Sequence, residues 1–152
     1  MILSTLCYIE KGGKYLMLHR TKKENDINKN KWIGVGGKFE EGESPEECLL
    51  REVEEETGLI LTVYKLRCIL TYVSNTYETE YIYVFTANDF KGDIIECNEG
   101  QLEWIDKEKI TDLNIWEGDK IFIDKMNSTN NFFTIKCKYD GDKLIEYDLN
   151  EY

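Results

Sequence analysis

The stretch Gly37–Leu59, GKFEEGESPEECLLREVEEETGL, carries the strongest pattern in the sequence. Within it, Ser44 is a favoured N-cap residue, Pro45 suits the first helical position, and Glu47 completes a capping box with the serine. Gly58 is the residue type that commonly stops a helix, because glycine adopts the left-handed backbone conformation without strain. The spacing therefore predicts one helix that begins at Pro45 and ends immediately before Gly58.

The predicted helix, Pro45–Thr57, has an acidic face beside an apolar one. At about 100° per residue, Glu52, Glu55 and Glu56 fall within about 100° of one another. The apolar stripe that would anchor the helix to a core consists of Leu49, Leu50, Val53 and Thr57. Two carboxylates about 4 Å apart repel each other by roughly 1 kcal/mol in water and roughly 4 kcal/mol at an effective dielectric of 20. Such a cluster is stable on a solvated surface or around a cation, and a few carboxylates completed by water and phosphate are how Mg²⁺ is usually held.

Seven residues of this stretch stand at fixed spacing, in the order Gly37, Glu43, Arg51, Glu52, Glu55, Glu56 and Gly58. At usual residue frequencies this pattern would coincide by chance on the order of once in 10⁸ starts. It resembles the signature of the Nudix hydrolases, which cleave nucleoside diphosphates linked to another group. The resemblance implies a single Nudix domain over residues 1–152. Its expected fold is an α/β/α sandwich around a mixed β-sheet, with the Nudix helix led by a glycine-rich loop over 34–42.

The resemblance also implies a metal site and its catalytic acids. The expected ligands of Mg²⁺, or of Mn²⁺, are the Gly37 carbonyl and the side chains of Glu52, Glu55, Glu56 and Glu99. The same four glutamates are the candidate catalytic residues, with Glu55 or Glu56 preferred as the base. Glu99 is assigned by its place before a strand tryptophan, Trp104, and Glu96 and Glu103 remain its rivals.

Arg51 and Glu43 are expected to have structural roles. In the family that the stretch resembles, the corresponding glutamate pairs with the arginine and holds the loop against the helix. The alternative is a pair within the helix, because Glu55 follows Arg51 by four residues. His19, the single histidine, supports neither a triad nor a histidine-rich metal site and is expected to be structural.

The composition is typical of one folded domain and argues against a nucleic-acid-binding surface. The chain has 152 residues, 41% of them hydrophobic, which is a common size for one domain with a core. With 19 basic and 30 acidic residues its formal net charge is −11, a poor match for a nucleic-acid-binding surface. An anionic substrate would be repelled unless metal ions screened it, although acidity can also serve solubility alone.

The cysteines and the apolar runs indicate the compartment. Five scattered cysteines without metal-ligand spacing predict reduced thiols instead of disulfides or a zinc site. The segment Met1–Glu10 lacks the features of a signal peptide, and no apolar run approaches the roughly 20 residues that span a membrane. We therefore expect a soluble, cytoplasmic protein with no membrane and no nucleic-acid partner. Whether it is a monomer or a homodimer stays open.

The rest of the chain reads mainly as β-strands. Predicted strands cover Met1–Ile9, Tyr15–His19, Leu61–Val73, Glu80–Ala87, Ile94–Ile95, Phe132–Tyr139 and Lys143–Leu149. The first two and the last two of these are predicted to form hairpins. A final helix is predicted to open within Asp112–Asp119 and to run to about Met126.

Motifs outside the helix stretch narrow the resemblance to the MutT/MutX-type branch. They are W-I-G-V-G-G-K at 32–38, Glu99 before Leu-Glu-Trp, W-E-G-D at 116–119, and a terminal Tyr-Asp-Gly-Asp hairpin. Proteins of this branch hydrolyse 8-oxo-dGTP to the monophosphate and pyrophosphate, which cleans the nucleotide pool and protects DNA. The expected substrate-binding residues are Arg20, Ile33, Gly36, Gly37, Lys38, Trp116 and Asp119.

The expected substrate leaves alternatives open. Trp116 is expected to stack on the purine and Asp119 to hydrogen-bond its edge, but a core tryptophan and a first-turn helix acid are equally consistent with the sequence. Ile33 and Gly118 stand where a mammalian member of this branch has polar residues, so base recognition must differ. Ordinary dGTP and other purine triphosphates are therefore rival substrates. ADP-ribose, a dinucleoside polyphosphate or a 5′-triphosphate RNA are rival substrates. A non-catalytic nucleotide-sensing module is the rival from another class.

Overall fold

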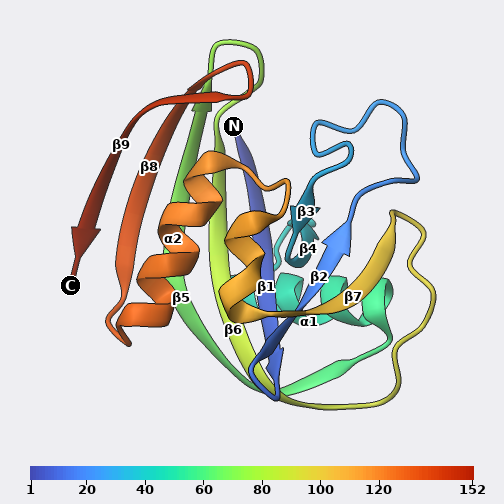
Figure 1. Ribbon diagram of the computed structural model, residues 1–152. Coiled ribbons are helices and arrows are strands. Elements are labelled where there is room, and N and C mark those ends of the chain that lie inside the picture. Colours follow the sequence, from blue (N-terminus) through green and yellow to red (C-terminus); the bar gives the residue numbers. More distant parts are fainter.

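Strand β1 (Ile2–Lys11) runs through the middle of the protein in the computed structural model, which describes residues 1–152 (Figure 1). Along one edge it pairs in parallel with β6 (Glu80–Lys91). Its other edge is divided between two antiparallel partners, β4 (Val35–Lys38) near its start and β2 (Lys14–His19) near its end. This division brings the glycines of β4 against the centre of the sheet.

One mixed sheet contains all the strands. The order is β3-β2-β1-β6-β5-β8-β9, with β4 paired to β1 and β7 paired to β2. The remaining strands are β3 (Trp32–Ile33), β5 (Ile60–Ser74), β7 (Gln101–Asp106), β8 (Phe133–Asp140) and β9 (Lys143–Glu151). The helical elements are α1 (Pro45–Thr57), a 3₁₀ helix η1 (Lys107–Asp112) and α2 (Glu117–Ser128).

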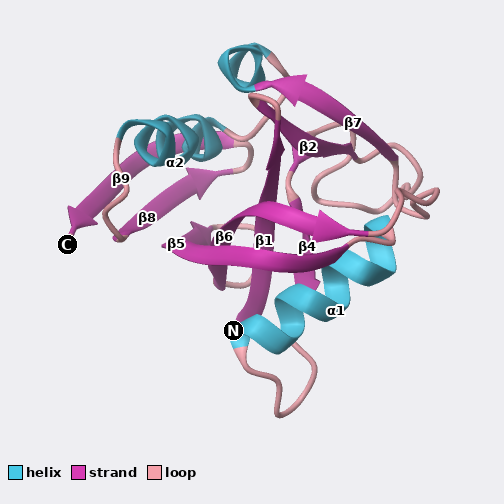
Figure 2. Cartoon of the chain, turned by 90° about the horizontal axis from the view of Figure 1, so that it is seen from below, coloured by secondary structure: helices cyan, strands magenta, loops and turns pink.

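The alternation of side chains along β1 divides the core into two layers. Cys7 and Ile9 pack in one apolar cluster with Leu49 and Val53 of α1. Tyr8 points to the opposite face and packs in a second cluster with residues of α2. Burying each such large side chain contributes roughly 1.5–3 kcal/mol. Helices α1 and α2 therefore lie on opposite faces of the sheet (Figure 2), which confirms the predicted α/β sandwich.

Helix α1 has the predicted ends. The Ser44 hydroxyl accepts a hydrogen bond from the Glu47 backbone N–H at 3.1 Å, and the Glu47 carboxylate accepts one from the Ser44 backbone N–H at 3.0 Å. Gly58 ends the helix with φ of 79°. Leu49, Val53 and Thr57 are buried, so the predicted apolar stripe faces the core.

Two expectations about the elements are wrong. Ile94–Ile95 forms no strand, although the Ile95 N–H donates to the Thr57 carbonyl at 2.8 Å. The glycine-rich segment predicted as a loop contains β4. The final helix, by contrast, begins at Glu117, within the predicted range Asp112–Asp119, and the residues before it form η1 and an extended turn.

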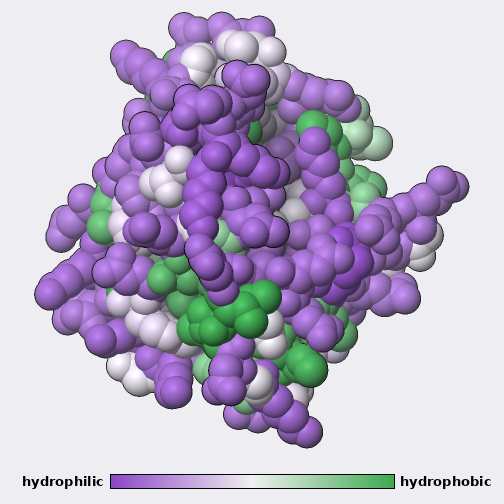
Figure 3. Space-filling view, turned by 90° about the vertical axis from the view of Figure 1, so that its right-hand side faces the viewer, coloured by the Kyte–Doolittle hydropathy of each residue, from purple (hydrophilic) through white to green (hydrophobic).

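The hydrophilic surface and the free thiols agree with what the composition predicts. Figure 3 shows a face that is mostly hydrophilic, with its largest apolar area low on that face. All five cysteines are free and buried. None of the helices is both long enough and apolar enough to cross a lipid bilayer.

Candidate active site

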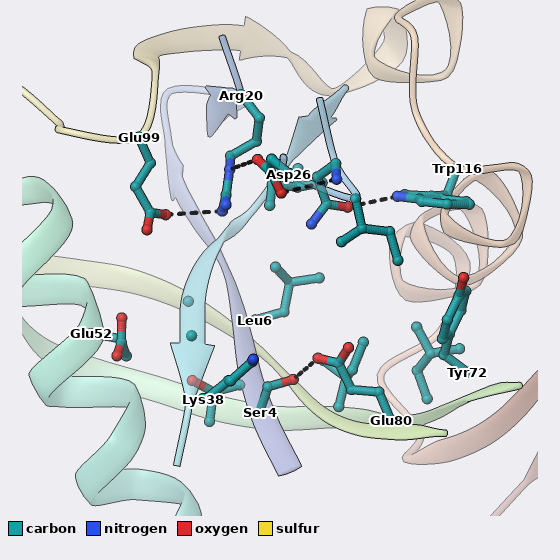
Figure 4. Close-up of a pocket in the computed structure, with 18 of the residues that line it drawn as sticks. Ser4, Leu6, Arg20, Asp26, Lys38, Glu52, Tyr72, Glu80, Glu99 and Trp116 are labelled. Carbon is teal, nitrogen blue, oxygen red and sulfur yellow. Dashed lines mark hydrogen bonds and ion pairs between the residues drawn. The ribbon is translucent and has the colours of Figure 1, made fainter. Parts of the chain in front are cut away.

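A cavity of about 690 Å³ extends from the acidic face of α1 to the start of α2. Glu52 and Glu99 lie at one end of it, and Trp116 and Tyr72 lie at the other (Figure 4). The predicted site residues that line it are Arg20, Ile33, Gly36, Gly37, Lys38, Glu52, Glu56, Glu99, Trp116 and Asp119. Glu55 does not line the cavity, and its side chain is 59% exposed.

The two glycines of β4 allow close contact with β1 on one side and with α1 on the other. A Cβ on Gly36 would lie 2.0 Å from the Thr5 carbonyl oxygen, and a Cβ on Gly37 would lie 2.4 Å from a carboxylate oxygen of Glu52. Any side chain at Gly37 would therefore displace the Glu52 carboxylate. The glycines are required by contact with β1 and with the acidic face of the helix.

Glu56 is the buried acid of the cluster. Its carboxylate accepts a hydrogen bond from the Gly36 N–H at 3.3 Å, and only 9% of the residue is exposed. Burial, followed by the charge and hydrogen bond of Glu99, raises the pKa of Glu56 to about 9. Glu56 and Glu99 therefore share a proton at neutral pH.

Two basic side chains form ion pairs with Glu99. Arg20 Nη1 lies 2.9 Å from one carboxylate oxygen of Glu99, and Lys23 Nζ lies 2.8 Å from the other. Burial opposes ionisation of Glu99, but Lys23 and Arg20 together hold its pKa below the usual value. The rivals Glu96 and Glu103 are exposed and lie outside the cavity, which leaves Glu99 as the acid of this segment that reaches the site.

Arg51 links the loop before α1 to the acids on it. Its Nε and Nη2 donate to both oxygens of Glu43 at 2.7 and 2.8 Å, and this contact lowers the pKa of Glu43 to about 2. Its Nη1 donates to Glu52 at 2.6 Å and to Glu55 at 3.3 Å. The loop–helix pair and the pair within the helix therefore exist together. Burial raises the pKa of Glu52 even though Arg51 opposes this.

The chemistry of these donors fits a divalent cation. Carboxylate and carbonyl oxygens are the ligands that Mg²⁺ and Mn²⁺ accept. No group of three or more such acids is already arranged around one point. Instead, Arg51 neutralises Glu52, while Arg20 and Lys23 neutralise Glu99. The proton that Glu56 shares with Glu99 supplies the positive charge that a cation could replace.

The far end of the cavity is aromatic. The Trp116 ring meets Tyr72 and Tyr139 edge to face, with ring centroids 5.8 and 5.2 Å apart. Trp116 is thus part of the core and also lines the cavity. Asp119 is buried beside it, and burial raises its pKa to about 7 although Lys31 opposes this.

The sequence did not indicate the residues that connect the two ends. Arg20 Nε donates to Asp26 Oδ2 at 2.7 Å, and Asp26 Oδ1 accepts the backbone N–H of Asn28 at 3.0 Å. Asn28 Oδ1 then accepts the indole N–H of Trp116 at 2.7 Å (Figure 4). A continuous series of contacts therefore runs from Glu99 to Trp116 through a polar segment that reads as an ordinary loop.

Comparisons with known proteins agree with this geometry. A family model described as the NUDIX domain matches residues 3–126. The chain is 29% identical over 151 residues to the oxidized purine nucleoside triphosphate hydrolase of Danio rerio, which covers 98% of this chain and 94% of the relative. It is 27% identical over 130 residues to the Mus musculus protein of the same name, covering 85% and 83%.

Solved structures give the same result. The Mutator MutT protein of Bacillus halodurans is 26% identical, with a TM-score of 0.88 over 99% of this chain and 98% of that one. The MutT protein of Methanosarcina mazei Go1 is 25% identical, with a TM-score of 0.74 over 84% and 93%. Because the family model covers most of the chain, the protein belongs to the Nudix family of hydrolases.

Proposed function

We propose that this protein is a metal-dependent nucleoside triphosphate pyrophosphohydrolase that converts 8-oxo-dGTP to 8-oxo-dGMP and pyrophosphate. The observation that carries this proposal is the division of one cavity into an acidic end and an aromatic end. A nucleoside triphosphate has the matching division, with a charged chain at one end and a flat base at the other. The names of the relatives support an oxidised purine as that base.

The acidic end is where we place the cation. Glu52, Glu56, Glu99 and the Gly37 carbonyl would hold Mg²⁺ or Mn²⁺, and Glu55 could join them only by turning away from Arg51. When bound, the cation would screen the phosphate charges and lower the pKa of a bound water. Glu56 is the proposed base: it holds a proton at neutral pH in the cation-free protein, and a bound cation would displace that proton and leave a carboxylate able to accept one from water.

Lys38 is the proposed phosphate contact among the cavity's cations. Arg20, Lys23 and Arg51 each contact a carboxylate, whereas Lys38 forms no ion pair. An ammonium without a partner at the cavity wall is free to pair with a phosphate oxygen. Arg20 is proposed to act mainly by holding Glu99, since its guanidinium is occupied by Asp26 and Glu99.

The aromatic end is where we place the base. Trp116 and Tyr72 offer aromatic surface, Asp119 offers a carboxyl group, and Ile33 offers an apolar wall. An apolar, aromatic pocket with few polar groups is typical of sites for flat ligands. On this proposal the protein serves nucleotide-pool sanitation, and thereby DNA repair.

Steady-state hydrolysis tests the proposal. The substrates are 8-oxo-dGTP, dGTP, dATP, ADP-ribose and a dinucleoside polyphosphate, each with Mg²⁺ and with a chelator. We expect kcat/KM for 8-oxo-dGTP to exceed that for dGTP by roughly tenfold, or about 1.4 kcal/mol, and activity to vanish with the chelator. The expected products are the monophosphate and pyrophosphate. A preference for ADP-ribose or for the dinucleotide would overturn the proposed base pocket, and turnover of nothing would favour a sensing module.

A further inference from the structure

Asn28 presents an amide group whose orientation is decided by its neighbour. Its Oδ1 accepts the indole N–H of Trp116 at 2.7 Å. An indole N–H can only donate, so the oxygen of the amide must face Trp116 and the nitrogen must face away from it. Asn28 lines the cavity, and its Nδ2 has no hydrogen-bond partner in the protein.

The backbone around Asn28 is held at several points. Its N–H donates to Asp26 Oδ1, and its carbonyl accepts the Lys31 N–H at 2.8 Å. The ammonium of Lys31 lies 4.7 Å from the centre of the Trp116 ring. Asp26 is in turn held by Arg20. The loop backbone and the Trp116 indole together therefore fix the position of the Asn28 amide.

The end of the cavity where Asn28 contacts Trp116 has apolar walls. Leu6, Ile27 and Ile33 line the same cavity and pack against the cluster that contains Trp116, whose ring edge carries the N–H that Asn28 accepts. When a base fills such a space and excludes water, an N–H group without an acceptor is costly. A base that carries a carbonyl oxygen at this point satisfies the donor, and a base that carries an amino group or a C–H does not.

We propose that Asn28 is a specificity-determining residue, whose Nδ2 donates a hydrogen bond to a ring carbonyl of an oxopurine stacked beside Trp116. The inference rests on the proposed function and adds the substrate class: purine nucleotides with a carbonyl at C6 or C8, in preference to adenine nucleotides that have neither. It also assigns two tasks to one amide, since the oxygen anchors Trp116 while the nitrogen reads the base.

The variant Asn28→Asp separates these two tasks. An aspartate keeps an oxygen for the Trp116 indole N–H but places a second oxygen, an acceptor, where the Nδ2 donor stood. Asn25→Asp is the matched control, because Asn25 lines the same cavity from the same loop and forms no side-chain hydrogen bond. Both variants add one negative charge to the cavity wall, so general repulsion of a triphosphate affects them alike.

Two ratios of kcat/KM measure how strongly the protein prefers a base with a ring carbonyl. The ratio of dGTP to dATP reports a C6 carbonyl, and the ratio of 8-oxo-dATP to dATP reports a C8 carbonyl. We expect at least one ratio to fall roughly tenfold or more in Asn28→Asp and to stay at its wild-type value in Asn25→Asp. Dissociation constants of the corresponding monophosphates, obtained from quenching of tryptophan fluorescence, should change in the same proportion.

The binding measurement keeps the two proposals distinguishable. If the wild type hydrolyses 8-oxo-dGTP and Asn28→Asp retains both wild-type ratios, the role of Asn28 is overturned while the proposed function stands. If the wild type neither hydrolyses 8-oxo-dGTP nor binds a purine monophosphate, the proposed function and this inference fail together. If both Asp variants lose the same ratio equally, the effect is one of charge, and the specific role of Asn28 is refuted.

Discussion

Glu56 and Glu99 place two carboxyl groups in contact inside the cavity, and only one of the two has basic side chains beside it to neutralise its charge. Arg20 and Lys23 favour the charged form of Glu99, whereas Glu56 has no cation in contact and is buried. Two interacting acids lose their protons as a pair, and the first proton leaves from the better-solvated, better-paired member. The proton therefore stays with Glu56, and a divalent cation that bound beside it would displace that proton.

Replacing Glu56 with Gln should abolish most of the activity without harming the fold. The amide keeps the shape of the side chain but can neither accept a proton nor bind a cation well. We expect kcat on 8-oxo-dGTP to fall by at least about a hundredfold, the scale of general acid–base catalysis. Circular dichroism and the thermal midpoint should show an intact protein, because Gln removes only a charge that burial disfavours. Glu54→Gln, on the exposed side of α1, is the control, and equal losses in both variants would contradict the role of Glu56.

Asp119 should make stability depend on pH in one direction. Burial raises its pKa from 3.8 in the unfolded chain to about 7 in the fold. The folded state therefore keeps a proton that the unfolded state loses, so the contribution is fully present below pH 4 and is lost as pH rises through about 7. The loss corresponds to up to about 4 kcal/mol. Neighbouring Tyr8 and Tyr139 titrate well above this range.

Urea unfolding of the wild type and of Asp119→Asn, between pH 4 and pH 8 with chelator present, measures this contribution. The free energy of unfolding of the wild type should fall relative to that of the variant as pH rises. Glu56 contributes equally to both proteins, so only the difference between the two curves matters. Parallel curves would show that Asp119 ionises in the fold as easily as in the unfolded chain.

At the scale of elements, the accuracy of prediction follows the range of the interactions. Helix α1 has the predicted ends because its signals, the capping box and Gly58, lie within the helix and its first neighbours. Strand β4 was missed because its glycines pair with β1, about thirty residues earlier in the chain. Ile94–Ile95 has strand-like residues, but no neighbouring strand offers it an edge, and Ile95 packs over Gly58 instead.

The site shows the same limit. The glutamates of α1 and the glycines of β4 were predictable, since their spacing in the sequence is the spacing of the motif. That Glu52 and Glu56 turn inward while Glu55 turns outward depends on how α1 packs against β4. Asn28 and Asp26 carry no local signal, because their partners, Trp116 and Arg20, are set by tertiary contact.

Two glycines with similar backbone angles should respond differently to alanine. Gly58 and Gly42 have φ of 79° and 81°, so an alanine at either position is strained by about 1 kcal/mol. A Cβ at Gly58 would also lie 2.8 Å from the Asp93 carbonyl oxygen and 2.9 Å from Ile95, whereas a Cβ at Gly42 meets nothing within 4 Å. We expect Gly58→Ala to lower the free energy of unfolding clearly more than Gly42→Ala does. Equal losses in urea unfolding would mean that the segment around Ile95 moves aside freely.

At the scale of the whole molecule, the chain has a net charge of −11 and gathers several acids into one cavity, where three of its cations already have partners. A substrate with a triphosphate would raise the negative charge further. The fold thus holds its acids at an electrostatic cost, and on the proposed function a bound divalent cation would relieve that cost at the point where substrate charge arrives. Cation binding should consequently be visible in the stability of the whole protein as well as in its activity.

Mg²⁺ should raise the thermal midpoint of the chelator-treated protein in the absence of any nucleotide. At a concentration about a hundred times the dissociation constant, binding to the folded state alone adds about 2.7 kcal/mol. For a chain of this size that corresponds to a rise of roughly 5–10 °C, measured by differential scanning calorimetry.

The double variant Glu52→Gln/Glu56→Gln should lose the rise, because both inward-facing acids of α1 are gone. Glu46→Gln/Glu54→Gln replaces two carboxyl groups on the exposed side of the same helix and should keep the rise. NaCl at matched ionic strength separates binding from screening. If the Glu52/Glu56 variant were stabilised as much as the wild type, the cation would act on the acidic surface in general, and the proposed site in the cavity would be refuted.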